Sequence, residues 1–373
     1  MEVDVACLGS MFNQNRSIRL RLTALLTAAA IMMATSVAAQ STDSLQPTTV
    51  TFAAVGDIMM GTTFPEDSNY LPEDDGRHML FEVAPELRSA DITFGNLEGC
   101  YIDGGTPAKK CQDPKSCYVF RSPEHYLSYL DEAGFDVFNL ANNHARDFGP
   151  EGLNRTRALL DSLGKVYTGP IGDVASLEVN GLRVVVLGFA PYQKLYDLLD
   201  IGTAAVMVAG FSTIYDLVIV SFHGGGEGPA FLHVPDSMEI AYGEERGHLR
   251  AFAHAVVDAG ADLVIGHGPH IPRAVEYYHG RLIAYSLGNF ATYEMFNMEG
   301  VRELTFILKA ELAADGSLVS GRIVSCYQQY PGIPRLDPKG RIIPLLQKIS
   351  RDDFGPTAAP IADDGTIIVP DKN

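Results

Sequence analysis

The stretch FDVFNLANNHARDFG, residues 135–149, determines how the rest of this chain is interpreted. Its first half alternates like a strand, and its second half is a polar turn that carries Asn142, Asn143 and His144. One interpretation is a turn whose asparagines cap a helix that begins near Pro150. The other is a metal or acid/base site, because an amide oxygen beside an imidazole suits either task. The other strand ends of the chain decide between the two.

Strands and helices alternate on both sides of this stretch. The pattern predicts strands at residues 49–55, 91–94, 135–140, 182–189, 216–222, 262–265 and 282–286, and a hairpin of 304–312 with 318–327 through Asp315-Gly316. Helices are expected at residues 81–88, 122–133, 150–163 and 239–259. This alternation favours an α/β sheet domain over a helical bundle or an all-strand sandwich.

Five of the predicted strands end in a side chain that can bind a metal or move a proton. These side chains are Asp57, Glu98, Asn143 with His144, His223, and His267 with His270. A single histidine is more often structural, but the carboxyl ends of strands in open α/β sheets gather around ligand sites. We therefore expect these residues to converge on Zn²⁺, Mn²⁺, Fe or Mg²⁺, which accept carboxylate, amide and imidazole ligands.

Glycines and two further polar residues accompany these strand ends. The segments FHGGGEG (222–228) and GHGPH (266–270) allow the backbone to approach a ligand closely. Asn289 ends another strand and is expected to orient a metal ligand. Glu227 is either a base or a solvated loop acid, and we favour the loop acid.

The first 39 residues have the order of a secretory leader. Arg16, Arg19 and Arg21 precede an apolar run and then small residues, so cleavage after Ala39 is predicted. We expect a linker at residues 40–48, one domain at 49–330, and a tail at 331–373 that wraps the domain or is partly disordered. After the leader no apolar run is long enough to span a bilayer, so an exported protein, periplasmic or extracellular, is predicted.

Four cysteines remain beyond the leader, at positions 100, 111, 117 and 326. An even number in an exported chain makes disulfides plausible, and the three possible pairings stay open. The net charge of −18 becomes about −19 without the leader, which holds three basic and two acidic residues. This charge disfavours nucleic acid as a partner, whereas an anionic substrate stays admissible beside a metal.

Six ordered motifs carry a resemblance to a known family. They are GDIMMG (56–61), GNLEG (95–99), NLANNHARDFG (139–149), SFHGGGE (221–227), GHGPH (266–270) and IAYSLGNF (283–290). Together they resemble the bacterial CapA family, capsule-synthesis proteins associated with poly-γ-glutamate. That family is related to the calcineurin-like metallophosphoesterases, so the resemblance implies a four-layer αββα sandwich with two packed β-sheets.

The resemblance also implies a site for one or two divalent metal ions and a role for each matching residue. Asp57, Glu98, Asn143, His223, His267 and His270 match metal ligands, and His144 matches the phosphoesterase acid. This chain departs from the phosphoesterase pattern at two positions. Met59 stands where phosphoesterases usually have a histidine, and Ala145 stands where they usually have an acid.

The expected function is that of an exported, metal-dependent protein acting in the synthesis or processing of an envelope polymer. An anionic polymer or peptide is the expected substrate, poly-γ-glutamate above all, with an envelope biosynthesis complex as a further partner. A phosphoesterase, a peptide epimerase and a non-catalytic polymer-binding or export component are the alternatives. Met59 is the best support for the non-catalytic alternative.

Overall fold

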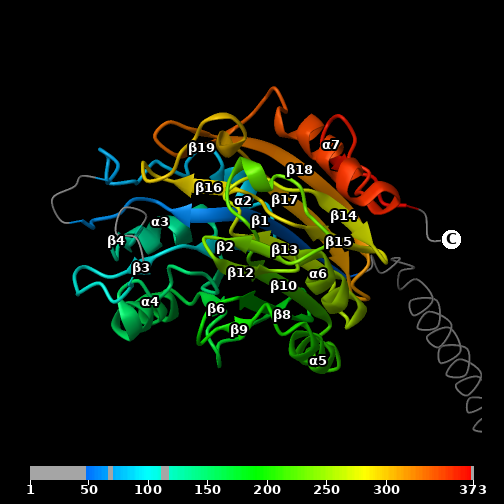
Figure 1. Ribbon diagram of the computed structural model, residues 1–373, viewed down its shortest axis with the longest axis horizontal. Helices are drawn as coiled ribbons and strands as arrows, with labels where there is room; N and C mark the ends of the chain where they lie inside the picture. Colours follow the sequence, from blue (N-terminus) through cyan, green and yellow to red (C-terminus); the bar gives the residue numbers. More distant parts are fainter. Residues whose placement is uncertain (1–47, 66–69, 111–116, 371–373) are drawn as a thin grey trace, which may run out of the picture. The chain divides into compact units, whose positions relative to one another are not determined.

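Strand β1 (Thr49–Met59) lies in the interior of the larger of the two main β-sheets in the computed structural model (Figure 1). The structure describes residues 48–65, 70–110 and 117–370. Successive side chains of a strand point to opposite faces of its sheet. Phe52 and Ala54 accordingly pack in the core shared with the smaller sheet, whereas Ala53 and Val55 pack with residues of the flanking helices. Both faces of β1 are therefore covered.

The larger sheet has the order β19-β18-β17-β1-β2-β5-β6, with β16 paired to the end of β1 and β20 paired to β18. The bounds are β2 (Ile92–Leu97), β5 (Val137–Asn139), β6 (Val166–Thr168), β16 (Asn289–Thr292), β17 (Leu304–Ala313), β18 (Leu318–Gln329), β19 (Ile333–Leu336) and β20 (Thr366–Ile367). Strands β1, β2, β5 and β6 are parallel, so their carboxyl ends lie at one edge.

The smaller sheet has the order β14-β15-β13-β10-β8-β7, with β9 paired to β8. The bounds are β7 (Ala175–Val179), β8 (Leu182–Ala190), β9 (Tyr196–Asp197), β10 (Leu217–His223), β13 (Leu263–His267), β14 (Val275–Tyr278) and β15 (Arg281–Ala284). Strands β8, β10 and β13 are parallel, and their continuous apolar runs suit a sheet buried on both faces.

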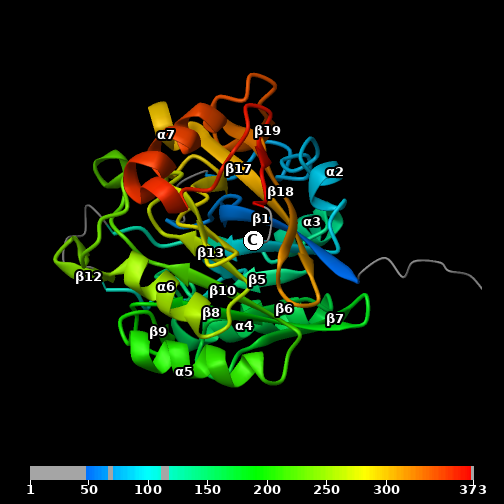
Figure 2. The same cartoon turned by 90° about the vertical axis from the view of Figure 1, so that its right-hand side faces the viewer.

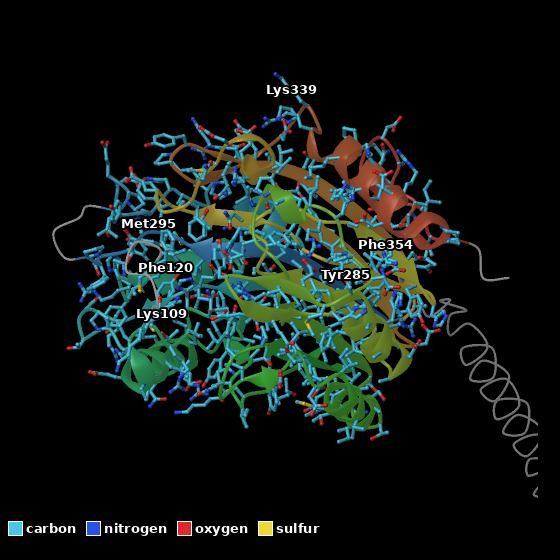
Figure 3. All side chains as sticks on the ribbon, viewed as in Figure 1. Lys109, Phe120, Tyr285, Met295, Lys339 and Phe354 are labelled. Carbon is cyan, nitrogen blue, oxygen red and sulfur yellow. The ribbon has the colours of Figure 1, made fainter. Side chains whose placement is uncertain are left out.

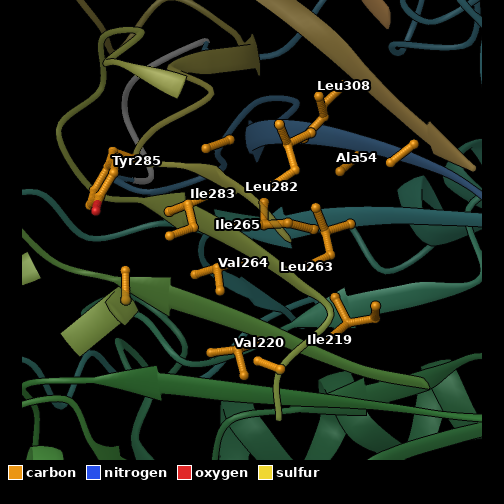
Figure 4. Close-up of a cluster of buried hydrophobic side chains, with 14 of the residues drawn as sticks. Ala54, Ile219, Val220, Leu263, Val264, Ile265, Leu282, Ile283, Tyr285 and Leu308 are labelled. Carbon is orange, nitrogen blue, oxygen red and sulfur yellow. The ribbon is translucent and has the colours of Figure 1, made fainter. Parts of the chain in front are cut away.

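Helices cover the outer faces of both sheets (Figures 1 and 2). Helices α2 (Ala84–Leu87), α3 (Tyr126–Ala133) and α4 (Gly149–Ser162) pack on the larger sheet, and α5 (Ile201–Ser212) and α6 (Leu249–Asp258) pack on the smaller one. Between the sheets, Ala54 and Leu308 share a core with Leu263 and Ile265 (Figure 4). The expected α/β sandwich of two packed sheets between helices is confirmed.

The helix expected at residues 239–259 is wrong in its first half. Strands β11 (Glu239–Ala241) and β12 (Glu244–Gly247) form a hairpin there, and only α6 is helical. Tyr242 and Gly243 connect the strands with φ values of 54° and 77°, a pair of left-handed residues that a helix cannot contain. The apolar spacing over this segment thus reflected a hairpin and a helix in succession.

The segment after residue 330 packs against the rest of the domain. Strand β19 extends the larger sheet, and the apolar side of α7 (Ile342–Phe354) joins the main core. The predicted leader lies outside the described residues, as does residue 111. Cys117 is disulfide-bonded, whereas Cys100 and Cys326 are free and buried. Within the described ranges, none of the helices has the length and apolar character that a membrane span requires.

Gly56 provides a test of the close backbone approach that places the end of β1. A Cβ atom at Gly56 would lie 1.8 Å from the carbonyl oxygen of Gly288, and the next amide, that of Asp57, donates to that same oxygen at 3.0 Å. We expect Gly56→Ala to lower the free energy of unfolding by about 1 to 3 kcal/mol in urea denaturation, because the backbone must move apart. Gly210→Ala is the control.

Gly210 lies in α5 with open space around its Cβ position. Its replacement by alanine should raise the free energy of unfolding by about 0.5 to 1 kcal/mol. Equal stability of the Gly56→Ala protein and the unaltered protein would contradict the packing described for β1.

Candidate metal centre

Two fully buried carboxylates, Asp57 and Glu98, lie beside each other where β1 and β2 end. The amide nitrogen of Asn96 joins them, since it donates to Asp57 Oδ1 at 2.8 Å and to Glu98 Oε1 at 3.2 Å. The Oδ1 of Asn96 accepts from Asn139 and Asn142, at 2.9 and 3.1 Å. These two donors fix the amide orientation, so the Asn96 nitrogen must face the carboxylates.

Two histidines from the smaller sheet face these carboxylates. His223 and His267 are direct neighbours in the parallel pairing of β10 and β13. The Nδ1 of His223 lies 3.5 Å from Glu98 Oε1, and the Nδ1 of His267 lies 3.5 Å from Asp57 Oδ1. Both rings are almost completely buried. The two sheets thus bring these strand ends to one point.

His270 reaches the same carboxylate from the loop after β13. Its Nδ1 lies 2.9 Å from Asp57 Oδ2 and 3.0 Å from Asn289 Oδ1. The backbone of His270 has a φ of 57°, in the left-handed region that non-glycine residues seldom adopt. Asn289, paired in register with Asp57, therefore orients His270.

Several buried atoms at this site have no hydrogen-bond partner within the described residues. They are Glu98 Oε2, His223 Nε2, and both ring nitrogens of His267. Asn143 Oδ1, in the turn after β5, is also buried without a partner. Buried polar atoms are nearly always paired, so a cluster of such atoms requires an explanation. One ligand atom each from Asp57, Glu98 and His223 can be chosen so that all lie within 4.8 Å of one another. Oxygen and imidazole donors in this arrangement fit a divalent cation.

The ionisation of the cluster reflects burial and the close charges. Burial raises the pKa of Glu98 to about 8, with the negative charge of Asp57 adding to the effect. Burial also acts to raise the pKa of Asp57, but the imidazoles of His267 and His270 beside it outweigh this effect and hold that pKa well below its usual range. For His270, burial is outweighed by Glu98 and Asp57, which raise its pKa to about 10. Burial lowers the pKa of His223.

His144 is part of a second group of side chains, in the turn after β5. Its Nδ1 lies 2.8 Å from Asp147 Oδ2 and 3.2 Å from Lys109 Nζ. The ring stacks on Phe120 with centroids 4.2 Å apart, and Figure 3 marks both Lys109 and Phe120. Asn142 forms the turn itself, because its Oδ1 accepts from the amides of residues 144 and 145.

Glu227 lies in an ion pair rather than in the carboxylate and imidazole cluster. Its Oε1 accepts from Arg246 at 2.8 Å, and the Arg246 side chain is only 5% exposed. Arg246 also donates to the hydroxyl of Tyr192, whose ring centroid is 6.2 Å from that of His223. Glu227 therefore belongs to a paired network bordering the cluster.

Three residues of this site were not identified from the sequence. Asn96 donates to both buried carboxylates. Asp147 places a carboxylate beside His144, although Ala145 occupies the position where an acid was expected. Lys109 comes from a loop with no periodic pattern. The amide in GNLEG, Asn96, and the acid three residues after His144, Asp147, could have been identified from the sequence. The position of Lys109 depends on the path of its loop, which the sequence does not show.

Comparison with known proteins identifies the family to which these motifs correspond. Residues 51–294 match the family described as bacterial capsule synthesis protein PGA_cap, which confirms the resemblance. The capsule biosynthesis protein CapA of Bacillus anthracis is 30% identical over 267 residues, covering 65% of this chain and 59% of that protein. The PGA biosynthesis protein CapA of Bacillus subtilis is 29% identical over 256 residues, covering 63% and 61%. The match therefore spans about three-fifths of these relatives.

Two solved structures align with much of this chain at low sequence identity. A 5′-nucleotidase precursor from Thermus thermophilus aligns with a TM-score of 0.41 and 12% identity, covering 77% of this chain and 54% of that one. A purple acid phosphatase from yellow lupin aligns with a TM-score of 0.40 and 12% identity, covering 78% and 54%.

The position of Asn96 between the carboxylates yields a test. Removal of its amide should weaken Mn²⁺ binding by about 10- to 100-fold, because Asp57 and Glu98 lose the donor that orients both. Competition titration with a metal indicator measures the effect in Asn96→Ala. The control is Asn154→Ala on the exposed side of α4. Equal affinity of both variants would contradict an orienting role for Asn96.

Proposed function

Because the chain belongs to the bacterial capsule synthesis protein family PGA_cap, we propose that it is an exported metal-dependent enzyme acting on an anionic envelope polymer. Poly-γ-glutamate is the polymer that the name of the Bacillus subtilis relative suggests, and hydrolysis or transfer at its amide bonds is the proposed chemistry. The observation that carries the proposal is the cluster of unpaired, buried ligand atoms around Asp57 and Glu98.

The proposed ligands to one or two divalent ions are Asp57, Glu98, Asn143, His223, His267 and His270. Such ions polarise a carbonyl or phosphoryl oxygen and lower the pKa of water. The burial of the cluster strengthens the electrostatic interactions made there. Asn96 and Asn289 hold Asp57, Glu98 and His270 in place.

His144 is the proposed proton-transfer residue. When the ring proton of His144 is on Nδ1, facing Asp147 Oδ2, the other ring nitrogen, Nε2, is available to the substrate or the leaving group. Burial lowers the pKa of His144, although Asp147 acts in the opposite direction. The neutral ring can therefore accept a proton near pH 7 and return it in a later step. Stacking on Phe120 holds the imidazole plane.

The proposed location is outside the cytoplasm. The leader pattern of residues 1–39 and the disulfide at Cys117 support it, because disulfides persist in oxidising compartments. An envelope biosynthesis complex is the proposed setting, in keeping with the capsule biosynthesis proteins to which the chain is similar.

Metal content provides the first test. We expect at least about one bound Mn²⁺ or Zn²⁺ per chain by elemental analysis, and loss of that metal in His223→Ala, since a buried imidazole ligand is removed. His279→Ala is the matched control, because His279 is exposed and pairs with Asp258. A metal content below one per chain that is the same in all three proteins would overturn the enzyme proposal and favour a polymer-binding component.

Activity provides the second test. The metal-loaded protein is incubated with poly-γ-glutamate, phosphate esters and envelope extract, and products are separated by chromatography. Loss of a proton-transfer group should slow product formation by about 10²- to 10⁴-fold in His144→Ala, with His279→Ala unchanged. Equal product from His144→Ala and the unaltered protein would remove His144 from the mechanism. Product from phosphate esters alone would replace amide chemistry with phosphoester hydrolysis.

A further inference from the structure

The connection after β16 passes along the border of the metal centre and carries an arginine with an unusual environment. Phe296 on this connection packs on His270, with ring centroids 5.1 Å apart, and on Phe120, at 5.6 Å. Arg302 follows in a short 3₁₀ turn (Gly300–Glu303) and is partly buried. One segment thus contributes both an aromatic contact to the site and a guanidinium at its border.

The guanidinium of Arg302 lies beside the glycine-rich segment, residues 224–228. Its Nη2 is 3.8 Å from the position that a Cβ on Gly228 would occupy. The amide of Gly228 donates to the carbonyl of Pro269 at 2.9 Å, which connects this segment to the residue before His270. The amide of Gly226 donates to Glu239 Oε2 at 3.0 Å. The surface next to Arg302 is therefore fixed in position and has no side chain at Gly228.

Within the described residues, the guanidinium of Arg302 has no hydrogen bond or ion pair, although Glu303 follows it in sequence and Glu227 precedes Gly228. Glu303 pairs with Arg341 at 2.5 Å, and Glu227 pairs with Arg246 at 2.8 Å. The cations nearer the centre are engaged in the same way, since Lys109 lies 3.4 Å from Asp147 Oδ1. A partly buried, unpaired guanidinium is a strong donor for a planar carboxylate.

We propose that Arg302 binds a carboxylate of the polymer next to the bond that is processed at the metal centre, in a subsite completed by Gly228. The inference rests on the proposed function and adds a residue that determines substrate specificity. Poly-γ-glutamate carries a free carboxylate on every unit, so one unit at the metal centre places others along its border. In a chain of net charge −18, an unpaired local cation gives such a polyanion a favourable contact.

The test measures binding of poly-γ-glutamate to the full-length Mn²⁺-loaded protein by isothermal titration calorimetry. Arg302→Gln should raise Kd by about five-fold, which corresponds to one partly exposed ion pair, and should make the salt dependence of Kd shallower. The Kd of Arg302→Lys should lie between those of Arg302→Gln and the unaltered protein, because lysine keeps the charge and lacks the planar guanidinium. Arg322→Gln, an exposed arginine opposite Lys309 on β17, is the matched control and should bind like the unaltered protein.

Each other outcome is informative. Equal binding by Arg302→Gln and the unaltered protein would overturn the subsite and leave the proposed function in place. An equal loss in Arg322→Gln would also overturn it, by showing a general effect of charge. Absence of polymer binding by the unaltered protein would overturn both the subsite and the polymer substrate. An unchanged Tm of Arg302→Gln excludes unfolding as the cause of weaker binding.

Discussion

The burial of Asp57 and Glu98 side by side is the constraint on which the site depends. Removing two carboxylates from water is costly unless each gains partners of opposite charge or strong donors. The protein supplies part of this compensation through Asn96 and through His267 and His270, and Asp57 stays ionised as a result. Glu98 receives less of it, which is why its pKa rises to about 8. A divalent ion would complete the compensation for both carboxylates.

Much of the fold and of this cluster follows from the sequence for a simple reason. Parallel strands end at a common edge, so residues at strand ends converge whatever the paths of the intervening loops. Asp57, His223 and His267 needed only this rule, and the strands that carry them were predicted correctly. The hairpin of β17 and β18 through Asp315-Gly316 was predicted equally well, because local turn chemistry specifies it.

The errors occurred where side-chain position depends on backbone conformations that periodicity does not encode. The hairpin of β11 and β12 requires left-handed residues at Tyr242 and Gly243, and its apolar residues imitate helical spacing. His270 was expected beside Asp57, but its left-handed backbone and the contact of Gly56 with the carbonyl of Gly288 were not predicted. Left-handed residues occur at several separate places in the chain, so the period of the apolar residues does not locate them.

The charge pattern around the cluster connects the fold to the proposed substrate. An acidic chain repels a polyanion at long range, but salt screens this repulsion beyond about 8 Å, so contacts at the site decide binding. Arg246 and Lys109 are compensated by Glu227 and Asp147, so they hold the network together and add little net positive charge. The proposed polyanion would therefore gain most from cations without a carboxylate partner and from the proposed metal ions. A polymer with regularly spaced carboxylates can contact the unpaired cation and the metal centre at the same time, if both lie along the path of the bound polymer. A single small anion can contact only one of them, so such an arrangement would favour the polymer.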